Sequence, residues 1–102
     1  MMHHLVVLKI KKNTRPAQIT RMFAELDGLK KKIPGLLSFA GGPYSSPEGL
    51  NQGFTHGFVM TFQDGKARDG YLTHPEHEKV KESILPLLEG GLDGVIAFDF
   101  SA

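Results

Sequence analysis

The sequence contains no cysteine, and this absence excludes several kinds of chemistry at once. A chain without thiols forms no disulfides, offers no thiolate to a metal and has no cysteine nucleophile. The formal net charge is only +1, so no general attraction to nucleic acid or to an anionic membrane is expected. The apolar runs are too short to span a bilayer. The start lacks the layout of a signal peptide, so we expect a cytoplasmic protein.

Two familiar motifs are also missing. The pair Gly41-Gly42 is followed by proline and lacks the lysine and the strand–loop–helix context of a phosphate-binding loop. No signature of a nucleophilic serine is present. The lysines at 30–32 are best interpreted as the solvated end of a helix rather than as a phosphate site.

The apolar pattern predicts one domain, residues 1–102, of the ferredoxin-like α+β class. Strands are expected at residues 4–10, 36–40, 53–62 and 92–100, in a four-stranded sheet. Helices are expected at 14–32, with Thr14 as the cap, and at 74–88, with a short helix between Asp64 and Tyr71. We expect the first and third strands to be parallel neighbours, which would place His4 and His56 at one end of the sheet.

The stretch from Tyr71 to His77 is the most informative part of the chain. Pro75 suits the first turn of a helix, and His74 stands where a helix cap would be. His77 extends the apolar stripe of that helix, which continues at Val80, Ile84, Leu87 and Leu88. Its ring is therefore expected to point inward, either as a satisfied core histidine or as a working one.

Alternation along the strands places further residues on defined faces. His4 and His56 share the parity of apolar neighbours and are expected to face the helices, together with Phe23 and Phe58. The opposite face still presents Leu5, Val7 and Val59, an apolar area that a soluble monomer rarely leaves open. A homodimer is therefore predicted.

In these segments the sequence resembles the stress-responsive A/B barrel domain family of the dimeric α+β barrel superfamily. The resemblance is carried by residues 4–9, 53–56, 71–77 and 98–100, in the right order along the chain. It implies a homodimer whose sheets pack face to face. One plant branch of the family contains a polyketide cyclase that needs neither a metal nor an organic cofactor.

The resemblance also implies a site. In that branch the histidine matching His77 is the general base and the tyrosine matching Tyr71 holds the substrate. Asp99 is expected to fix the tautomer of His77, and the three are the candidate catalytic residues. The candidate substrate-binding residues are His4, His56, His74, Phe23 and Phe58. The expected ligand is a small apolar carbonyl compound. The flanking residues do not match the branch, so the substrate cannot be transferred.

Other interpretations remain open. A metal held by His74 and His77 lacks a tight third ligand, so no metal site is predicted. The main alternative is a structural, stress-associated dimer without chemistry. A second alternative is the handling of haem or oxygen, which would need a histidine free to ligate iron. An apolar cavity beside the candidate residues would favour the enzyme.

Overall fold

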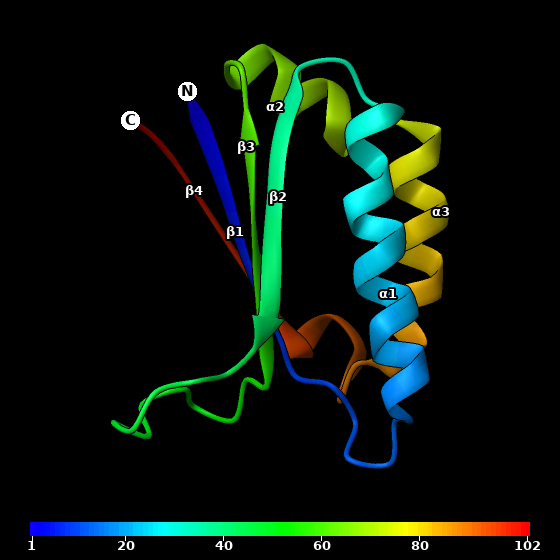
Figure 1. Ribbon diagram of the computed structural model, residues 1–102, viewed down its shortest axis with the longest axis vertical. Helices are drawn as coiled ribbons and strands as arrows, with labels where there is room; N and C mark the ends of the chain where they lie inside the picture. The colour runs from blue at the N-terminus through cyan, green and yellow to red at the C-terminus, as the bar shows by residue number, and fades with distance from the viewer.

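An antiparallel sheet forms the frame of the computed structural model, which describes residues 1–102 (Figure 1). Its strands lie in the order β2-β3-β1-β4. The strands are β1 (Met2–Leu8), β2 (Leu36–Pro43), β3 (His56–Phe62) and β4 (Val95–Ser101). The helices are α1 (Pro16–Gly28), α2 (Gly65–Leu72) and α3 (Pro75–Ile84). Short 3₁₀ helices occupy Leu29–Lys31, Leu85–Leu87 and Gly91–Gly94. The predicted ferredoxin-like fold is confirmed. None of the helices is long and apolar enough to cross a membrane.

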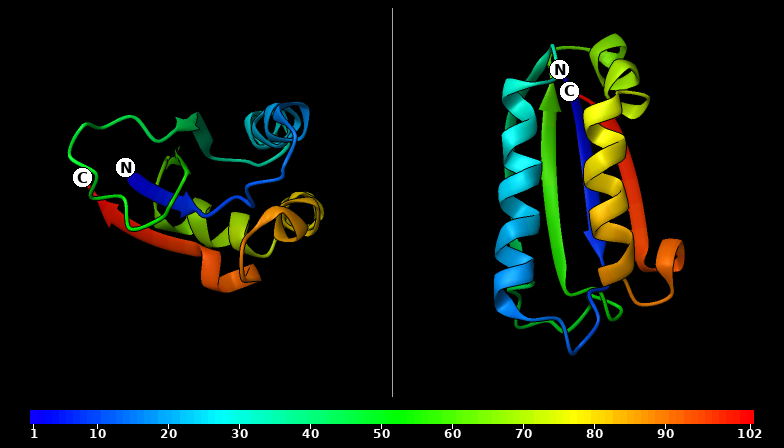
Figure 2. Two further views of the ribbon diagram at one scale, coloured as in Figure 1. Left: turned by 90° about the horizontal axis from the view of Figure 1, so that it is seen from below. Right: turned by 90° about the vertical axis from the view of Figure 1, so that its right-hand side faces the viewer.

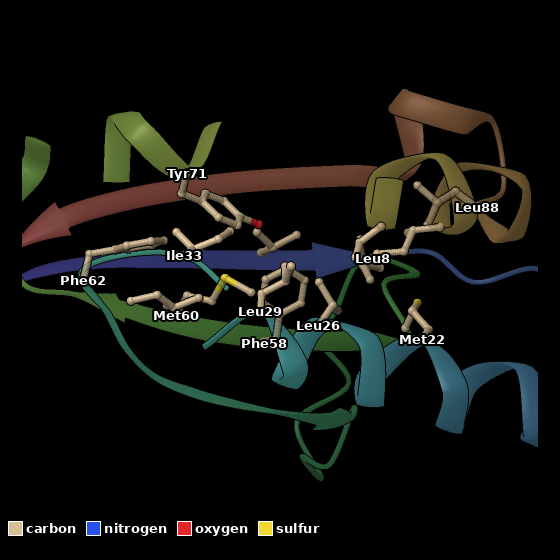
Figure 3. Packing of buried hydrophobic residues seen from close by; sticks show 14 of the residues in the cluster. Leu8, Met22, Leu26, Leu29, Ile33, Phe58, Met60, Phe62, Tyr71 and Leu88 are labelled. Carbon is tan, nitrogen blue, oxygen red and sulfur yellow. The ribbon is translucent and has the colours of Figure 1, made fainter. Parts of the chain in front are cut away.

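The long helices α1 and α3 lie side by side on one face of the sheet, and the other face is left uncovered (Figure 2). The core fills the space between them, and Figure 3 shows how its side chains interdigitate above β1 and β3. The most completely buried members are Leu26, Leu29, Met60, Phe62, Tyr71 and Leu88.

The predicted direction of the third strand is wrong. β3 runs antiparallel to β1, with His4 opposite Met60 and Leu8 opposite His56. The cause is the connection: β3 follows β2 through a hairpin and is inserted between β2 and β1, so it must run against both. His4 and His56 therefore lie toward opposite ends of the sheet, and not at one end as expected.

Prolines set the helix boundaries. Pro16 and Pro75 occupy the first turns of α1 and α3, where a missing N–H leaves no hydrogen bond unmade. The helix predicted at 74–88 ends early because of Pro86. α3 stops at Ile84 and is followed by a 3₁₀ helix that begins at Leu85. The cap of α1 is Arg15 rather than Thr14, and the backbone N–H of Arg15 donates to Gln18 Oε1 at 2.9 Å.

The uncovered face of the sheet is apolar across its centre. Leu5 and Val7 of β1 are joined there by a row from β4, in which Phe98 is 64% exposed. The registers place Leu5 opposite Phe98 and Val7 opposite Ile96, so the exposed side chains form one continuous patch. We call this the open face; its members are Leu5, Val7, Ile96, Phe98 and Phe100.

Candidate active site

The register of β1 and β4 creates the first part of the site. His4 lies directly opposite Asp99, and opposite residues in an antiparallel pair project to the same side of the sheet. That side is the one covered by the helices, where His4 is only 6% exposed. Its ring lies edge-on to Tyr71, with centroids 5.6 Å apart. The prediction that His4 faces the helices is confirmed.

The second part of the site comes from the junction of α2 and α3. The rings of Tyr71 and His77 stack with centroids 4.0 Å apart and planes at 28°. In Figure 3 the Tyr71 hydroxyl points away from Phe62, along β1 toward Leu8. His74 caps α3 by accepting a hydrogen bond from the Glu76 backbone N–H at 3.1 Å. The cap and Pro75 fix the start of α3 and hence the direction of the His77 ring.

A cavity of about 180 Å³ lies between α3 and the half of the sheet formed by β1 and β4. Its wall is mainly aliphatic, and the polar side chains that reach it are His4, Tyr71, His77 and Lys81. The apolar lining includes Val6, Leu8, Leu26, Phe58, Val80, Ile84, Leu88, Val95 and Ala97. A mostly apolar cavity with a few convergent polar groups is the usual form of a small-molecule site.

Burial sets the protonation of the two stacked rings. It lowers the pKa of His77. The positive charge of Lys81 lowers this pKa further, whereas the backbone of Leu72 and the negative charge of Glu78 raise it. Burial and the negative charge of Asp99 raise the pKa of Tyr71. The His77 ring is therefore neutral and the Tyr71 hydroxyl keeps its proton near neutral pH. His77 Nδ1 is buried and has no hydrogen-bond partner.

Asp99 connects two cationic or proton-donating groups. His4 Nδ1 lies 2.7 Å from Asp99 Oδ1, and Arg68 Nη1 donates to Asp99 Oδ2, also at 2.7 Å. Burial alone would raise the pKa of Asp99, but the hydrogen bonds from Arg68 and His4 outweigh it, so the net pKa is lowered. Asp99 is thus a carboxylate that only accepts, and the proton in its bond to His4 belongs to Nδ1.

This geometry corrects the expected partner of Asp99. Both carboxylate oxygens are occupied by His4 and Arg68, and no hydrogen bond joins Asp99 to His77. The physical reason is the register, because an antiparallel neighbour directly opposite lies closer than a side chain on a helix packed above. The structure assembles Tyr71 and His77 as predicted, but it gives the carboxylate to His4.

Three of the expected substrate-binding residues lie outside the cavity. His56 sits at the other end of the sheet, where its Nδ1 is 2.8 Å from Thr55 Oγ1 and burial lowers its pKa. Phe23 packs on β2, with its ring centroid 6.2 Å from that of Phe39. His74 is occupied as the cap of α3. Only His4 and Phe58 of that set line the cavity.

Arg68 belongs to the site but was not among the predicted residues. It also donates to Asp69 Oδ1 at 2.8 Å, and the hydrogen bonds to both carboxylates raise its pKa. A signal was available, because Arg68 precedes Tyr71 by three residues and residues three apart share one side of a helix. A basic residue on the inward side of a short helix predicts a carboxylate partner.

The fold is that of a known class of protein. A family model described as the stress responsive A/B barrel domain matches residues 2–102, and the chain belongs to that family. A stress-response A/B barrel domain-containing protein of Arabidopsis thaliana is 34% identical over 101 residues, which cover 95% of this chain and 82% of that protein.

Two further relatives bear on function and assembly. The olivetolic acid cyclase of Cannabis sativa is 30% identical over 74 residues, which cover 72% of this chain and 73% of the cyclase. A crystal structure of a dimeric ferredoxin-like protein of unknown function from Jannaschia sp. CCS1 superposes with a TM-score of 0.88. It is 32% identical, and the match covers 99% of this chain and 98% of that one.

Proposed function

We propose that this protein is a cofactor-free acid–base catalyst that acts on a small apolar carbonyl compound in the cavity beside α3. The observation that carries the proposal is the convergence of His4, Tyr71 and His77 on an otherwise aliphatic cavity. Three proton-exchanging side chains in a wall that is otherwise aliphatic are expected where a polar ligand binds. The similarity to a cyclase supports this class of reaction.

The stacked pair provides the two functions that proton abstraction next to a carbonyl requires. A neutral His77 is a general base, because its lowered pKa leaves the ring unprotonated at neutral pH. Tyr71 keeps its proton and donates a hydrogen bond to the carbonyl oxygen, where negative charge develops as the C–H proton leaves. Both interactions become stronger beside an aliphatic wall when the ligand displaces water from the cavity.

The proposal is tested by hydrogen–deuterium exchange of the methyl protons of acetophenone, a single-ring ketone, followed by NMR in D₂O. His77→Ala should lose about 10²–10⁴-fold of the protein-catalysed exchange, the usual contribution of a general base. Lys79→Ala is the matched control, because Lys79 lies on the same helix with a 73% exposed side chain. Exchange that is no faster than in buffer, or equal in His77→Ala and wild type, would refute the proposal.

The same proposal includes a homodimer joined through the open face. An apolar patch that crosses two strands is rarely left in water by a soluble monomer, and the relative from Jannaschia is dimeric. Phe98→Glu places a charge at the centre of the patch and should give the monomer mass in sedimentation. Ala24→Glu adds the same charge to an exposed site on α1 and should leave the dimer intact. A wild-type monomer at micromolar concentration would contradict the assembly.

A structural, stress-associated dimer without chemistry is the competing function. It predicts the same assembly and no exchange of acetophenone protons, so the exchange experiment separates the two functions, and sedimentation tests the assembly that they share. The setting that we propose for either function is the cytoplasm, which fractionation of the source cells would test.

A further inference from the structure

Building on the proposed function, we infer that His4 is a second proton-accepting group of the cavity and that Arg68 is the positioning residue that holds Asp99 against it. The first step is the hydrogen bond between His4 Nδ1 and Asp99 Oδ1, at 2.7 Å. Since the carboxylate only accepts, Nδ1 carries the proton and Nε2 carries the lone pair. A carboxylate holds the base of a hydrolase triad in this tautomer.

The second step concerns what Nε2 faces. No side chain or backbone group bonds to it, while the His4 ring lines the cavity. Every charged or titratable group around the ring can be named. β4 contributes Asp99, α2 contributes Arg68 and Tyr71, and α3 contributes His77 and, in the cavity wall, Lys81, whereas β3 presents only Phe58 and Phe62. None of these groups forms a hydrogen bond with Nε2. The remaining partner for Nε2 is a ligand in the cavity.

The third step is the part played by Arg68. Its guanidinium occupies Asp99 Oδ2 at 2.7 Å, and its side chain is only 21% exposed. A carboxylate held at both oxygens cannot rotate away from His4.

The ligand class follows from these acceptors and from the size of the cavity. A free Nε2 needs a donor, so the ligand carries a hydroxyl group or the enol form of its carbonyl. In the transfer the ligand's O–H bond breaks, its electron pair stays on oxygen, and the proton bonds to Nε2, while the other ring proton stays on Nδ1 and remains hydrogen-bonded to Asp99. A cavity of about 150 Å³ holds benzene. The present 180 Å³ therefore suits one ring with a short substituent.

The test uses the whole chain of residues 1–102 and the ¹⁵N resonances of the His4 ring, which distinguish the two tautomers without any substrate. In wild type we expect the proton on Nδ1. In Asp99→Asn, Arg68 should bind the amide oxygen, because a guanidinium only donates hydrogen bonds. The amide N–H₂ then turns toward His4, and the ring proton moves from Nδ1 to Nε2. Adding Arg68→Gln removes that constraint and should give a mixture of tautomers, whereas Arg68→Lys should retain the shift.

Arg21→Gln in the same Asp99→Asn background is the matched control. Arg21 pairs with Glu25 on the exposed side of α1 and should leave the tautomer shift unchanged. Circular dichroism verifies the fold of every variant. A proton on Nε2 in wild type would overturn the assignment of the dyad. A proton that stays on Nδ1 in Asp99→Asn would overturn the role of Arg68, because the amide oxygen would then face His4. A complete shift that survives Arg68→Gln would overturn the role of Arg68.

Phenol and toluene then probe the free nitrogen. Both match one ring in size, but only phenol donates a hydrogen bond, so phenol should shift the Nε2 resonance and toluene should not. Binding of phenol that perturbs Val80 and Ile84 without a response at Nε2 would overturn the ligand-facing role of His4. If neither probe binds, the cavity of the proposed function and the ligand role of His4 both fail, whereas the assignment of Arg68 is still decided by the tautomers.

Discussion

Gly41→Ala tests how closely the middle of β2 packs against β3 and α1. A methyl group added at Gly41 would lie 2.7 Å from Phe23 Cε1, 2.8 Å from Phe58 Cβ and 3.0 Å from the Gly57 carbonyl oxygen. The Phe23 ring can turn aside, but the other two atoms are fixed by the ladder that pairs Gly41 with Phe58. The cost therefore falls in the range for overpacking, about 1–3 kcal/mol.

The neighbouring glycine is the matched control. A methyl group at Gly42 would meet nothing within 4 Å, although it lies in the same strand. Removing a glycine from a strand is neutral or stabilises by about 0.5–1 kcal/mol, because the unfolded chain loses freedom. Gly42→Ala is therefore expected to unfold at the same urea concentration as wild type, or at a higher one.

Equilibrium urea unfolding measures both variants. All samples are held at one protein concentration, because dimerisation adds to apparent stability. A lower midpoint with an unchanged slope for Gly41→Ala indicates a loss of stability rather than a change in the unfolded state. Equal midpoints for Gly41→Ala and Gly42→Ala would refute the close packing of Gly41 against Phe58 and Gly57 of β3.

Two further predictions concern pH and the start of α3. Burial lowers the pKa of His77 in the folded state, so its contribution to stability is complete above its unfolded pKa and is lost as the pH falls below about 6.5. His77→Phe should reduce the decline in urea midpoint between neutral and mildly acidic pH, and a decline as steep as in wild type would contradict this assignment. His74→Ala removes the acceptor for the Glu76 N–H and should cost about 0.5–2 kcal/mol, whereas His74→Asn retains an acceptor and should cost less. Equal losses for the two substitutions would show that the cap contributes nothing.

The sequence was sufficient for the order of the elements and for one half of the candidate site, but not for the direction of β3. The order of elements, the helix start at Pro75 and the cap at His74 depend on local rules of backbone geometry, and the structure agrees with them. The inward direction of His77 follows from the spacing of its helix, and the ring stacks on Tyr71. These features need only neighbours in the chain.

The other half depends on contacts that local patterns do not encode. Asp99 was assigned to His77 because the register of β1 against β4 was unknown, and that register gives the carboxylate to His4. Phe23 was placed in the cavity because its helical face is correct, but the missing side chain of Gly41 lets the ring settle on β2 instead. The spacing of apolar residues predicts which face of a helix or strand is buried. It does not predict which residues that face contacts.

The pairing of His4 with Asp99 also has a consequence for the synthesis of the protein. The two residues are 95 positions apart, and β1 finds its neighbours only when β3 and then β4 have been made. A nascent chain that ends before β4 has no carboxylate for His4 or Arg68, and it lacks the cavity wall supplied by Val95 and Ala97. Contacts of such long sequence separation form late and slowly. The residues of the candidate site therefore meet only after β4 has been synthesised, and a shorter nascent chain contains His4, Tyr71 and His77 without the carboxylate and the complete cavity wall.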